Sequence, residues 1–540
     1  MKYKTPTCID KIGEGVFLKV PLYKRKNKLK LLYVNPKLFE EYFKTSYTFE
    51  KACEYIEEYF SVTINDKYRL DDNQIGEAYV DYQADPTNIA LDGNSGSGRA
   101  YYIGEDFNVK GELTPLATSP YPVYSNGKLS LESAIHETLI SNVLGAEFKT
   151  TTYQTLAVLD PEETYLFPGS DNPMKCGVMV RVNKDNQLYR FSHRFVNKKP
   201  FTGEELYHIA TNMGVIEGQK IIHRLIHGAW SLGNMSIDTN MIDFDTTYFV
   251  QNRNPSFSFT PKYKTNYFGF EDLGQLKMLE ILINSELNID NVTLEELEKI
   301  LCREKDEEIL RAFPMLMGIE IEPSEELRNL TNEFIRLSKF MFKSYDELNT
   351  MNKNNNEVAL FNFSNFFRHY PLLVKDNIYS VNRCLRLILN GDGEIFDKEN
   401  NDLKNIIDGY FKKYKIDTDS EFLKLIEDVI RFIIAYDKIF KSNVKDIGEA
   451  VKRAYIINED RKHLFNNEYT KYRLASSYDG TNNDFINNIM NIIIDGSIRN
   501  NGGKVCDLDI ENNIATFNTF VGTDMKEKRI DLNKQKKLKR

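Results

Sequence analysis

The sequence has little of several features that would assign a class of protein at once. Its 540 residues include one tryptophan, seven histidines and six cysteines, and the cysteines are widely spaced with no CxxC pair. This spacing is typical of reduced thiols in a cytoplasmic protein rather than of a disulfide framework. No apolar run approaches the ~18 residues that a membrane-spanning helix needs, and the N-terminus, MKYKTPTCIDKIGEG, lacks the apolar core of a signal peptide. We therefore expect a cytoplasmic protein with no membrane partner.

An excess of basic charge is also absent. Lysine and arginine number 70 against 79 aspartate and glutamate residues, which gives a formal net charge of −9. A general nucleic-acid binder normally shows a basic footprint. We therefore expect no nucleic-acid partner.

The hydrophobic pattern changes along the chain and predicts an α+β protein with five regions. The first has amphipathic helical spacing over 39–60, the second alternates short strands with one helix, the third is a helix followed by a polar elbow, and the fourth is mostly helical, with a break at Pro314. The fifth ends in KEKRIDLNKQKKLKR and is expected to be disordered. The regions are an N-terminal extension (1–87), a small lobe (88–200), a large-lobe core (201–290), a helical C-terminal region (291–510) and a basic tail (511–540).

The second region carries a glycine loop, a strand lysine and a helix glutamate. Gly96 and Gly98 lie between two predicted strands, where glycine allows a ligand to approach the backbone, although an ordinary hairpin turn also fits. Lys110 ends the strand FNVKG, and Glu137 lies within the helix LSLESAIHETLISNVLGAEF, for which Ser130 is a candidate N-cap. A solvated glutamate is the common alternative. Kinases, however, use a strand lysine and a helix glutamate of this kind to hold phosphates.

Two arginines lie in or just after the second of two further predicted strands, YQTLAVLD and KCGVMVRV. Arg181 lies in the second of these strands and Arg190 lies just beyond it. The guanidinium fork suits phosphate oxygens, although a surface ion pair is the common role of such arginines.

The stretch His227 to Asp245, HGAWSLGNMSIDTNMIDFD, is the centre of the predicted site. Asn234 and Asp243 are far enough apart for a tight hairpin that would bring the amide and carboxylate oxygens together. These are hard oxygen ligands of the kind that Mg²⁺ takes when it also holds nucleotide phosphates. Helical spacing over 202–230 would place His223 and His227 on one helix face. Because Arg224 stands where an HExxH protease needs its glutamate, we expect structural histidines there and not a zinc pair.

Five segments together resemble a known family. The first part of HGAWSLGN…MIDFD is similar to the HGDxxxxN element of small-molecule kinases, but the selenoprotein O family is a closer match. Its segments read approximately GDGRAxxLGE, LKGxGxTP, SIRE, RVA…IRFGHF and HGVMNTDNMSI…IDYG. This chain has, in the same order, GSGRAYYIGE (96–105), VKGELTP (109–115), AIHE (134–137), RVN…YRFSHRF (181–195) and HGAWSLGNMSI…IDFD (227–245). The resemblance covers about 88–250.

The resemblance implies a bilobal protein-kinase-like fold and an adenylyltransferase. In that family ATP is bound flipped, so that AMP is transferred to a Ser, Thr or Tyr hydroxyl of a protein, with Mg²⁺ or Mn²⁺ as the metal. The residues carried over are Lys110 and Glu137 as the lysine–glutamate pair, Arg181 and Arg190 as phosphate contacts, Asn234 and Asp243 as metal ligands, and Gly96, Gly98 and Arg99 as the loop over the nucleotide. Lys110, Glu137 and Asp243 would be the catalytic set.

The sequence departs from the family at positions that bear on activity. Gly233 stands where the family has an acidic residue before the asparagine, Ala229 stands where small-molecule kinases have their catalytic aspartate, and the C-terminus has no counterpart of the redox-active residue. Asp238 or Asp245 could replace a lost base. Two alternatives therefore stay open. One is an ATP-binding pseudokinase that acts as a regulatory module, and the other is an enzyme that activates a carboxylate or peptide through an adenylate.

Overall fold

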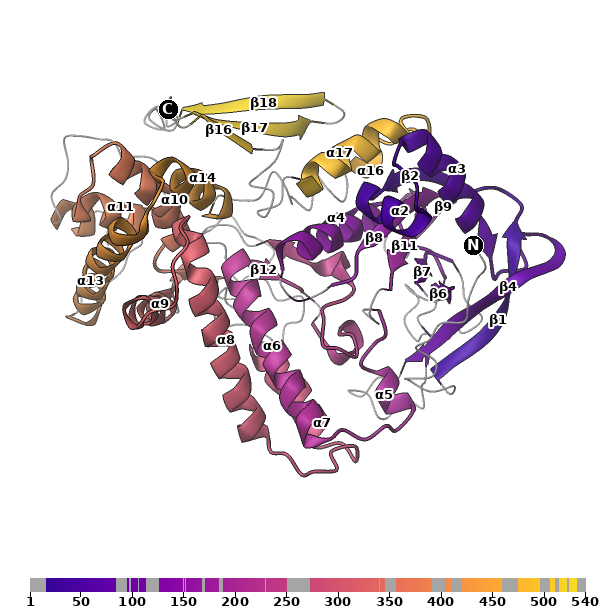
Figure 1. The fold of residues 1–540 in the computed structure, drawn as a ribbon, viewed down its shortest axis with the longest axis horizontal. Helices are drawn as coiled ribbons and strands as arrows, with labels where there is room; N and C mark the ends of the chain where they lie inside the picture. Colours follow the sequence, from indigo (N-terminus) through magenta and orange to yellow (C-terminus); the bar gives the residue numbers. More distant parts are fainter. Residues whose placement is uncertain are drawn as a thin grey trace.

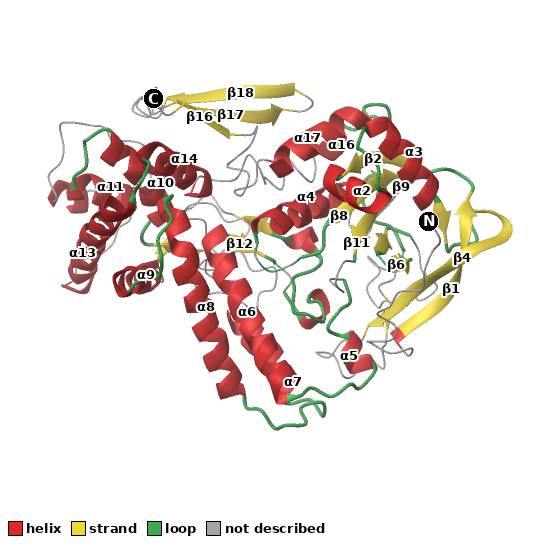
Figure 2. Ribbon diagram, viewed as in Figure 1, coloured by secondary structure: helices red, strands yellow, loops and turns green. Residues whose placement is uncertain are grey.

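The computed structural model shows a mixed α+β protein (Figure 1). The residues that it describes are 16–83, 95–96, 99–104, 106–112, 126–148, 150, 152–167, 170–183, 188–228, 230–249, 272–338, 340–344, 356–390, 404–408, 420–458, 474–495, 506–509, 514–521 and 524–531. One large sheet lies beside a group of long helices (Figure 2). The predicted strand before Gly96 lies outside the described residues.

The large sheet is antiparallel throughout. Its strands follow the order β2-β8-β11-β7-β6-β4-β1-β3, and β5 pairs with the end of β4. The strands are β1 (Phe17–Arg25), β2 (Lys30–Val34), β3 (Val62–Thr63), β4 (Arg69–Gln83), β5 (Ser95–Gly96), β6 (Ala100–Ile103), β7 (Phe107–Lys110), β8 (Thr155–Asp160) and β11 (Val178–Val182). The predicted strands that end at Lys110, Asp160 and Val182 are confirmed.

The segment predicted as an N-terminal extension supplies four of these strands. Strand β4 pairs with β6 and β2 pairs with β8, so residues 17–83 contribute strands on both sides of β6, β7 and β11. The helical pattern over 39–60 corresponds to two helices, α2 (Pro36–Phe43) and α3 (Phe49–Phe60). The N-terminal segment therefore belongs to the same sheet as β6, β7 and β11, on which the candidate site is built.

Each strand alternates its side chains between two apolar layers, as the period of two requires. On β7, Phe107 and Val109 pack with α2 and α3, whereas Asn108 and Lys110 point to the opposite face. Helix α4 (Leu131–Glu147) covers that opposite face, and its N-cap is Ser130, whose hydroxyl accepts a hydrogen bond from the backbone N–H of Ser133. The predicted helix and its cap are confirmed.

The C-terminal part of the chain returns to the edge of the sheet. Helix α17 (Asn483–Asp495), which follows the short α16 (Leu474–Ser476), lies against the edge strand β2 (Figure 1). The Asn487 amide oxygen accepts from the Val34 N–H at 3.0 Å, and the Asn483 amide donates to the Leu31 carbonyl at 2.6 Å. These side chains satisfy backbone groups that an open sheet edge would leave exposed.

The remaining large part is helical. Its elements are α6 (Gly203–His223), α7 (Asp272–Ile283), α8 (Leu294–Met317), α9 (Glu325–Ser338), α10 (Phe363–Lys375), α11 (Val381–Asn390), α13 (Ser420–Asn443) and α14 (Ile447–Asn458), with short strand pairs β12 (Leu225–Ile226) with β13 (Tyr248–Phe249) and β14 (Met341–Ser344) with β15 (Asn356–Ala359). Helices α6 and α8 lie side by side (Figure 1). Their close approach depends on glycine, because a Cβ at Gly214 would lie 2.5 Å from the Leu301 carbonyl oxygen.

Three predictions about the helical part and the tail were wrong. Helix α6 ends at His223, where Arg224 takes a left-handed conformation, so the predicted helix over 202–230 is too long. Pro314 lies inside α8 and does not end it; the helix stops at Gly318, which has a positive φ. Part of the tail is ordered, because β17 (Ile514–Val521) and β18 (Asp524–Asp531) lie within it and form a three-stranded antiparallel sheet with β16 (Cys506–Asp509).

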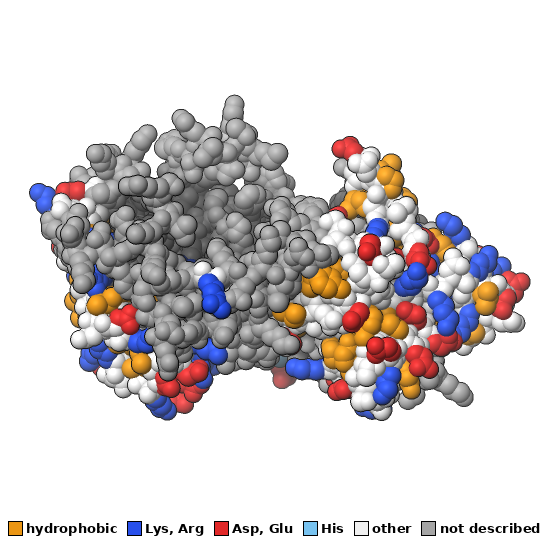
Figure 3. Space-filling model, turned by 90° about the horizontal axis from the view of Figure 1, so that it is seen from above, with side chains coloured by type: hydrophobic (Ala, Val, Ile, Leu, Met, Phe, Trp, Pro, Cys, Tyr) orange, Lys and Arg blue, Asp and Glu red, His pale blue; other side chains and the backbone are white. Residues whose placement is uncertain are grey.

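Acidic and basic side chains are interspersed over the described part of the face shown in Figure 3. Within the described residues, no helix has the length and apolar character needed to cross a bilayer.

Candidate functional site

Lys110 and Glu137 form a buried ion pair beneath the sheet. The Lys110 Nζ lies 2.5 Å from Glu137 Oε2, and the two side chains are 3% and 0% exposed. Strand β7 ends with Lys110 facing α4, and Glu137 lies in the middle of that helix. The helix lies close to the sheet partly because Gly177 has no side chain, since a Cβ there would meet the Ala134 Cβ at 3.0 Å. The predicted pairing is therefore present.

Two further groups hold the other carboxylate oxygen of Glu137. The Tyr153 hydroxyl donates a short hydrogen bond to Oε1, and Arg181 Nη1 lies 3.3 Å from the same atom. Burial raises the pKa of the Tyr153 hydroxyl well above its usual value, and the Glu137 charge raises it further. Arg181 is itself anchored by Asn108, whose amide oxygen accepts from Nε at 3.1 Å and from Nη2 at 2.6 Å. In this geometry Arg181 orients Glu137, and its predicted contact with phosphate stays a prediction.

Asp243 is the third member of the cluster. Its Oδ1 lies 3.1 Å from Lys110 Nζ, and its backbone adopts a left-handed conformation with φ +68°. Aspartate tolerates this conformation better than most residues. Burial by itself would raise the pKa of this carboxyl, but nearby cations, of which Lys110 and Arg190 act most strongly, outweigh burial and hold the pKa well below its usual value. Asp243 is therefore ionised at neutral pH.

The predicted hairpin between Asn234 and Asp243 is confirmed. Met235 and Met241 face each other in an antiparallel bridge, and the Ile242 N–H donates to the Asn234 carbonyl at 3.1 Å. Thr239 makes the turn with a φ of +65°. Asp245 lies just beyond the hairpin, in a short 3₁₀ helix, Phe244–Thr246.

The guanidinium of Arg190 lies between the two predicted metal ligands. Its Nη1 donates to Asn234 Oδ1 at 3.1 Å and makes a short hydrogen bond to the Gly233 carbonyl, and its Nη2 lies 3.7 Å from Asp243 Oδ2. The oxygens of Asn234 and Asp243 therefore contact the same guanidinium, and their chemistry suits Mg²⁺. No group of three or more histidine, cysteine, aspartate or glutamate side chains among the described residues is arranged to hold a metal ion. A metal at this position would need further oxygen ligands.

His223 and His227 have separate structural roles. His223 lies at the end of α6 and contacts the Glu147 carboxylate at 3.0 Å. His227 lies beyond the helix, and its Nε2 is 2.8 Å from the Ile242 carbonyl, to which it donates. Burial lowers the pKa of His227 to about 4, so the ring is neutral at pH 7. The expectation that both histidines share one helix face was wrong because α6 ends before His227.

The glycine loop is described only in part. Gly96 lies in β5, and Gly98 is outside the described residues. Arg99 precedes β6; its carbonyl accepts from the Gly111 N–H at 2.7 Å, and its guanidinium donates to the Lys128 carbonyl at 3.4 Å. The positive charge of Arg99 also lowers the pKa of Asp243, which places it near the cluster.

A second buried charge cluster was not predicted from the sequence. Arg25, at the end of β1, pairs closely with Glu112 and lies 3.1 Å from Glu163. Lys128 lies 2.6 Å from the same Glu163 carboxylate, and the Tyr101 hydroxyl donates to Glu112 at 3.1 Å. This cluster fixes the turn that follows Lys110. The partners are distant in the sequence, so no local pattern indicated it.

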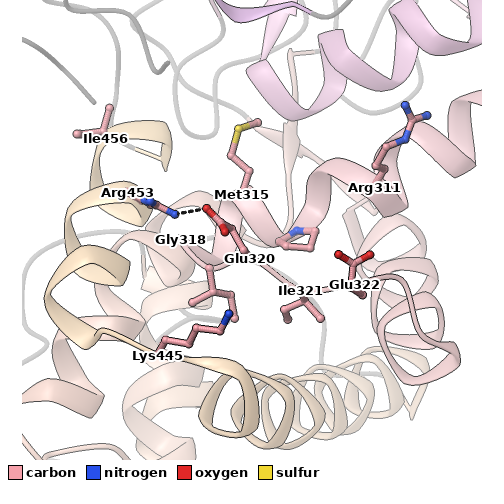
Figure 4. Close-up of a pocket in the computed structure, with 11 residues that line it drawn as sticks. Arg311, Met315, Gly318, Glu320, Ile321, Glu322, Lys445, Arg453 and Ile456 are labelled. Carbon is pink, nitrogen blue, oxygen red and sulfur yellow. Dashed lines mark hydrogen bonds and ion pairs between the residues drawn. The ribbon is translucent and has the colours of Figure 1, made fainter. Parts of the chain in front are cut away.

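The helical region contains a separate pocket of about 610 Å³ (Figure 4). It lies between the end of α8, the loop after Gly318 and helix α14. Arg453 crosses one side of it to pair with Glu320 at 2.8 Å, and Lys445 and Ile321 also line it. Its lining contains none of the predicted site residues, so it is distinct from the Lys110 cluster.

No protein-family model matches the chain, and a search of curated protein sequences finds no significant match.

Proposed function

We propose that this chain is a kinase-like protein adenylyltransferase, as its resemblance to the selenoprotein O family implies. The observation that carries the proposal is the buried Lys110–Glu137 pair with Asp243 in contact with the same lysine. These three residues come from segments far apart in the chain, and each was carried over from a different motif of the family. Their convergence is the arrangement that kinases use to hold nucleotide phosphates.

The architecture is compatible with a bilobal kinase-like fold. In this proposal the antiparallel sheet and α4 form the small lobe, and α6 with the hairpin that follows begins the large lobe. The nucleotide would lie against Lys110, Arg99 and Arg190, and its metal against Asn234 and Asp243. We also propose a cytoplasmic location and a protein or peptide acceptor.

In the proposed reaction an acceptor hydroxyl oxygen forms a bond to the α-phosphorus of ATP. The bond between that phosphorus and the bridging oxygen of the β-phosphate breaks, so that pyrophosphate leaves. The hydroxyl proton passes to a carboxylate, for which Asp245 and Asp238 are candidates, or to water. Mg²⁺ or Mn²⁺, when bound, would neutralise charge on the phosphates. Lys110 and Arg190 would orient the same phosphates, and Glu137 would hold Lys110 in place.

One observation favours a second function, that of an ATP-binding pseudokinase. Gly233 supplies no acidic side chain beside Asn234. A general base typically contributes ~10²–10⁴-fold to a rate, so its loss slows a reaction without removing the nucleotide site. The third possibility, an enzyme that activates a carboxylate or peptide, uses the same site with a different acceptor.

A double-label experiment separates these functions. The protein is incubated with Mg²⁺ or Mn²⁺ and ATP labelled at the α or the γ phosphate, and protein-bound label is measured. We expect the α label and not the γ label on protein. The γ label would identify a phosphotransferase, ATP binding without either label a pseudokinase, and free AMP with pyrophosphate but no labelled protein an adenylate-forming enzyme.

Two variants test the position of the site. Asp243→Ala should abolish metal-dependent ATP binding and labelling. Asp72→Ala, which changes an exposed carboxylate paired with Arg69 at 3.0 Å, is the matched control and should change neither. Unchanged ATP affinity of Asp243→Ala in the presence of Mg²⁺ would refute this site.

A further inference from the structure

Arg190 contacts both of the predicted metal ligands. One guanidinium nitrogen faces the Asn234 amide oxygen at 3.1 Å, and the other faces the Asp243 carboxylate at 3.7 Å. The Arg190 side chain is 13% exposed, so this contact is largely shielded from water. A planar guanidinium presents several N–H donors in a fixed fork, which suits such a bridging role.

The Asp243 carboxylate therefore has a cation at each oxygen. Lys110 lies at Oδ1 and Arg190 at Oδ2. A divalent cation that entered beside Asn234 and Asp243 would meet the positive charge of Arg190 at short range. Among the described residues, no group of three or more acidic, histidine or cysteine side chains is arranged to hold it, so it would need further oxygen ligands.

Nucleotide phosphates would change both the charge of Arg190 that a metal ion meets and the shortage of ligands for that ion. Phosphate oxygens are strong acceptors for a guanidinium, so they can replace Asp243 and Asn234 as partners of Arg190. They also supply the oxygen ligands that Mg²⁺ normally takes from a substrate rather than from the protein.

We propose that Arg190 is an exchangeable counter-ion of the metal site. Without nucleotide it holds Asn234 and Asp243; when nucleotide binds, the phosphates take over its guanidinium and the two ligands become available to the metal. Metal and nucleotide therefore bind together, and the metal binds poorly alone. This inference rests on the proposed function, because it requires a nucleotide at the Lys110 cluster.

Binding of Mn²⁺, followed by electron paramagnetic resonance of the free ion, tests the exchange without any catalytic turnover. The full-length protein is titrated with Mn²⁺, with and without α,β-methylene-ATP, and the binding of the analogue to Mn²⁺ in solution is subtracted. We expect Mn²⁺ to bind wild-type protein at least 10-fold more tightly with the analogue. Arg190→Gln should bind Mn²⁺ alone at least 10-fold more tightly than wild type.

Control variants keep the test independent of folding. Arg328→Gln removes an exposed arginine that pairs with Glu307, and it should leave Mn²⁺ binding unchanged. Arg190→Lys keeps one positive charge but cannot bridge both oxygens, so it should bind Mn²⁺ alone with intermediate affinity; it carries the test if Arg190→Gln does not fold.

The outcomes separate the two proposals. Equal affinity of wild type and Arg190→Gln for Mn²⁺ alone, with the analogue still bound by wild type, would overturn the exchange and leave the nucleotide site standing. Failure of wild type to bind the analogue with or without Mn²⁺ would overturn the proposed function, and the exchange with it.

Discussion

Replacing Glu112 by leucine would leave Arg25 as a buried cation without its closest counter-charge. The two side chains are 2% and 3% exposed, and the ion pair joins the end of β1 to the turn after β7. Breaking a buried pair by removing one partner typically costs ~3–5 kcal/mol, because the remaining charge is left uncompensated. Glu163 remains 3.1 Å from Arg25, so we expect the lower end of that range, about 3 kcal/mol.

Amide hydrogen exchange in β6 and β7 is the suitable measurement, since it reports the opening free energy of this part of the sheet. A loss of about 3 kcal/mol corresponds to exchange that is on the order of 100-fold faster. Amides of α9 and α13, which belong to a different apolar core, serve as the internal control and should keep their rates.

The double variant Arg25→Met with Glu112→Leu tests the physical cause. Replacing both charges by apolar groups of similar size is often neutral, because no unpaired charge is left in the interior. We therefore expect protection to return to within about 1 kcal/mol of wild type. An unprotected double variant would show that the loss came from altered packing, and wild-type exchange in Glu112→Leu alone would show that the pair contributes little.

Three other predictions concern pH, activity and helix packing. Burial lowers the pKa of His227 to about 4, so between pH 4 and 6.5 the unfolded state binds a proton that the folded state does not. The free energy of unfolding should therefore rise with pH across that window by about 3 kcal/mol. His227→Gln should lose this part of the slope when urea unfolding is measured as a function of pH. Among the described residues, a Cβ at Gly233 would contact only Ser231 Oγ, at 3.7 Å, so Gly233→Asp should fit and increase α-phosphate labelling at least ~10-fold. Unchanged labelling with intact ATP binding would refute a missing base. Gly214→Ala would force α6 away from the Leu301 carbonyl and should lower unfolding free energy by about 1–3 kcal/mol, and an unchanged urea midpoint would count against close packing there.

Those parts of the fold that depend on local pattern could be predicted from the sequence. The strand that ends at Lys110, the helix capped by Ser130 and the hairpin before Asp243 each carry their own periodicity or turn signal, and all three are present. Strand β4 was missed because its sequence, RLDDNQIGEAYVDYQ, is polar over much of its length, and pairing with β1 and β6 stabilises it. Its structure therefore depends strongly on its neighbours in the sheet.

Long-range packing could not be predicted. Helix α17 reads as one more amphipathic helix of the C-terminal region, yet its asparagines bind the edge of β2, more than 450 positions earlier in the chain. The pairing of Arg25 with Glu112 also joins residues that are far apart in the sequence. In the site, the motifs correctly predicted that Lys110, Glu137 and Asp243 lie together. The location of Arg190 between Asn234 and Asp243 depends on the fold around them and had no signal in the sequence.

The charge balance of the two buried clusters distinguishes a structural role from ligand binding. Around Arg25, two cations face two carboxylates, as expected for a cluster that only stabilises the fold.

Around Lys110 the balance among the described residues is different, because three cations (Lys110, Arg181 and Arg190) contact two carboxylates (Glu137 and Asp243). An uncompensated positive charge in a buried site is costly unless an anion joins it. Among the described residues, the Lys110 cluster therefore has the charge balance that the proposed nucleotide site requires, and the Arg25 cluster does not.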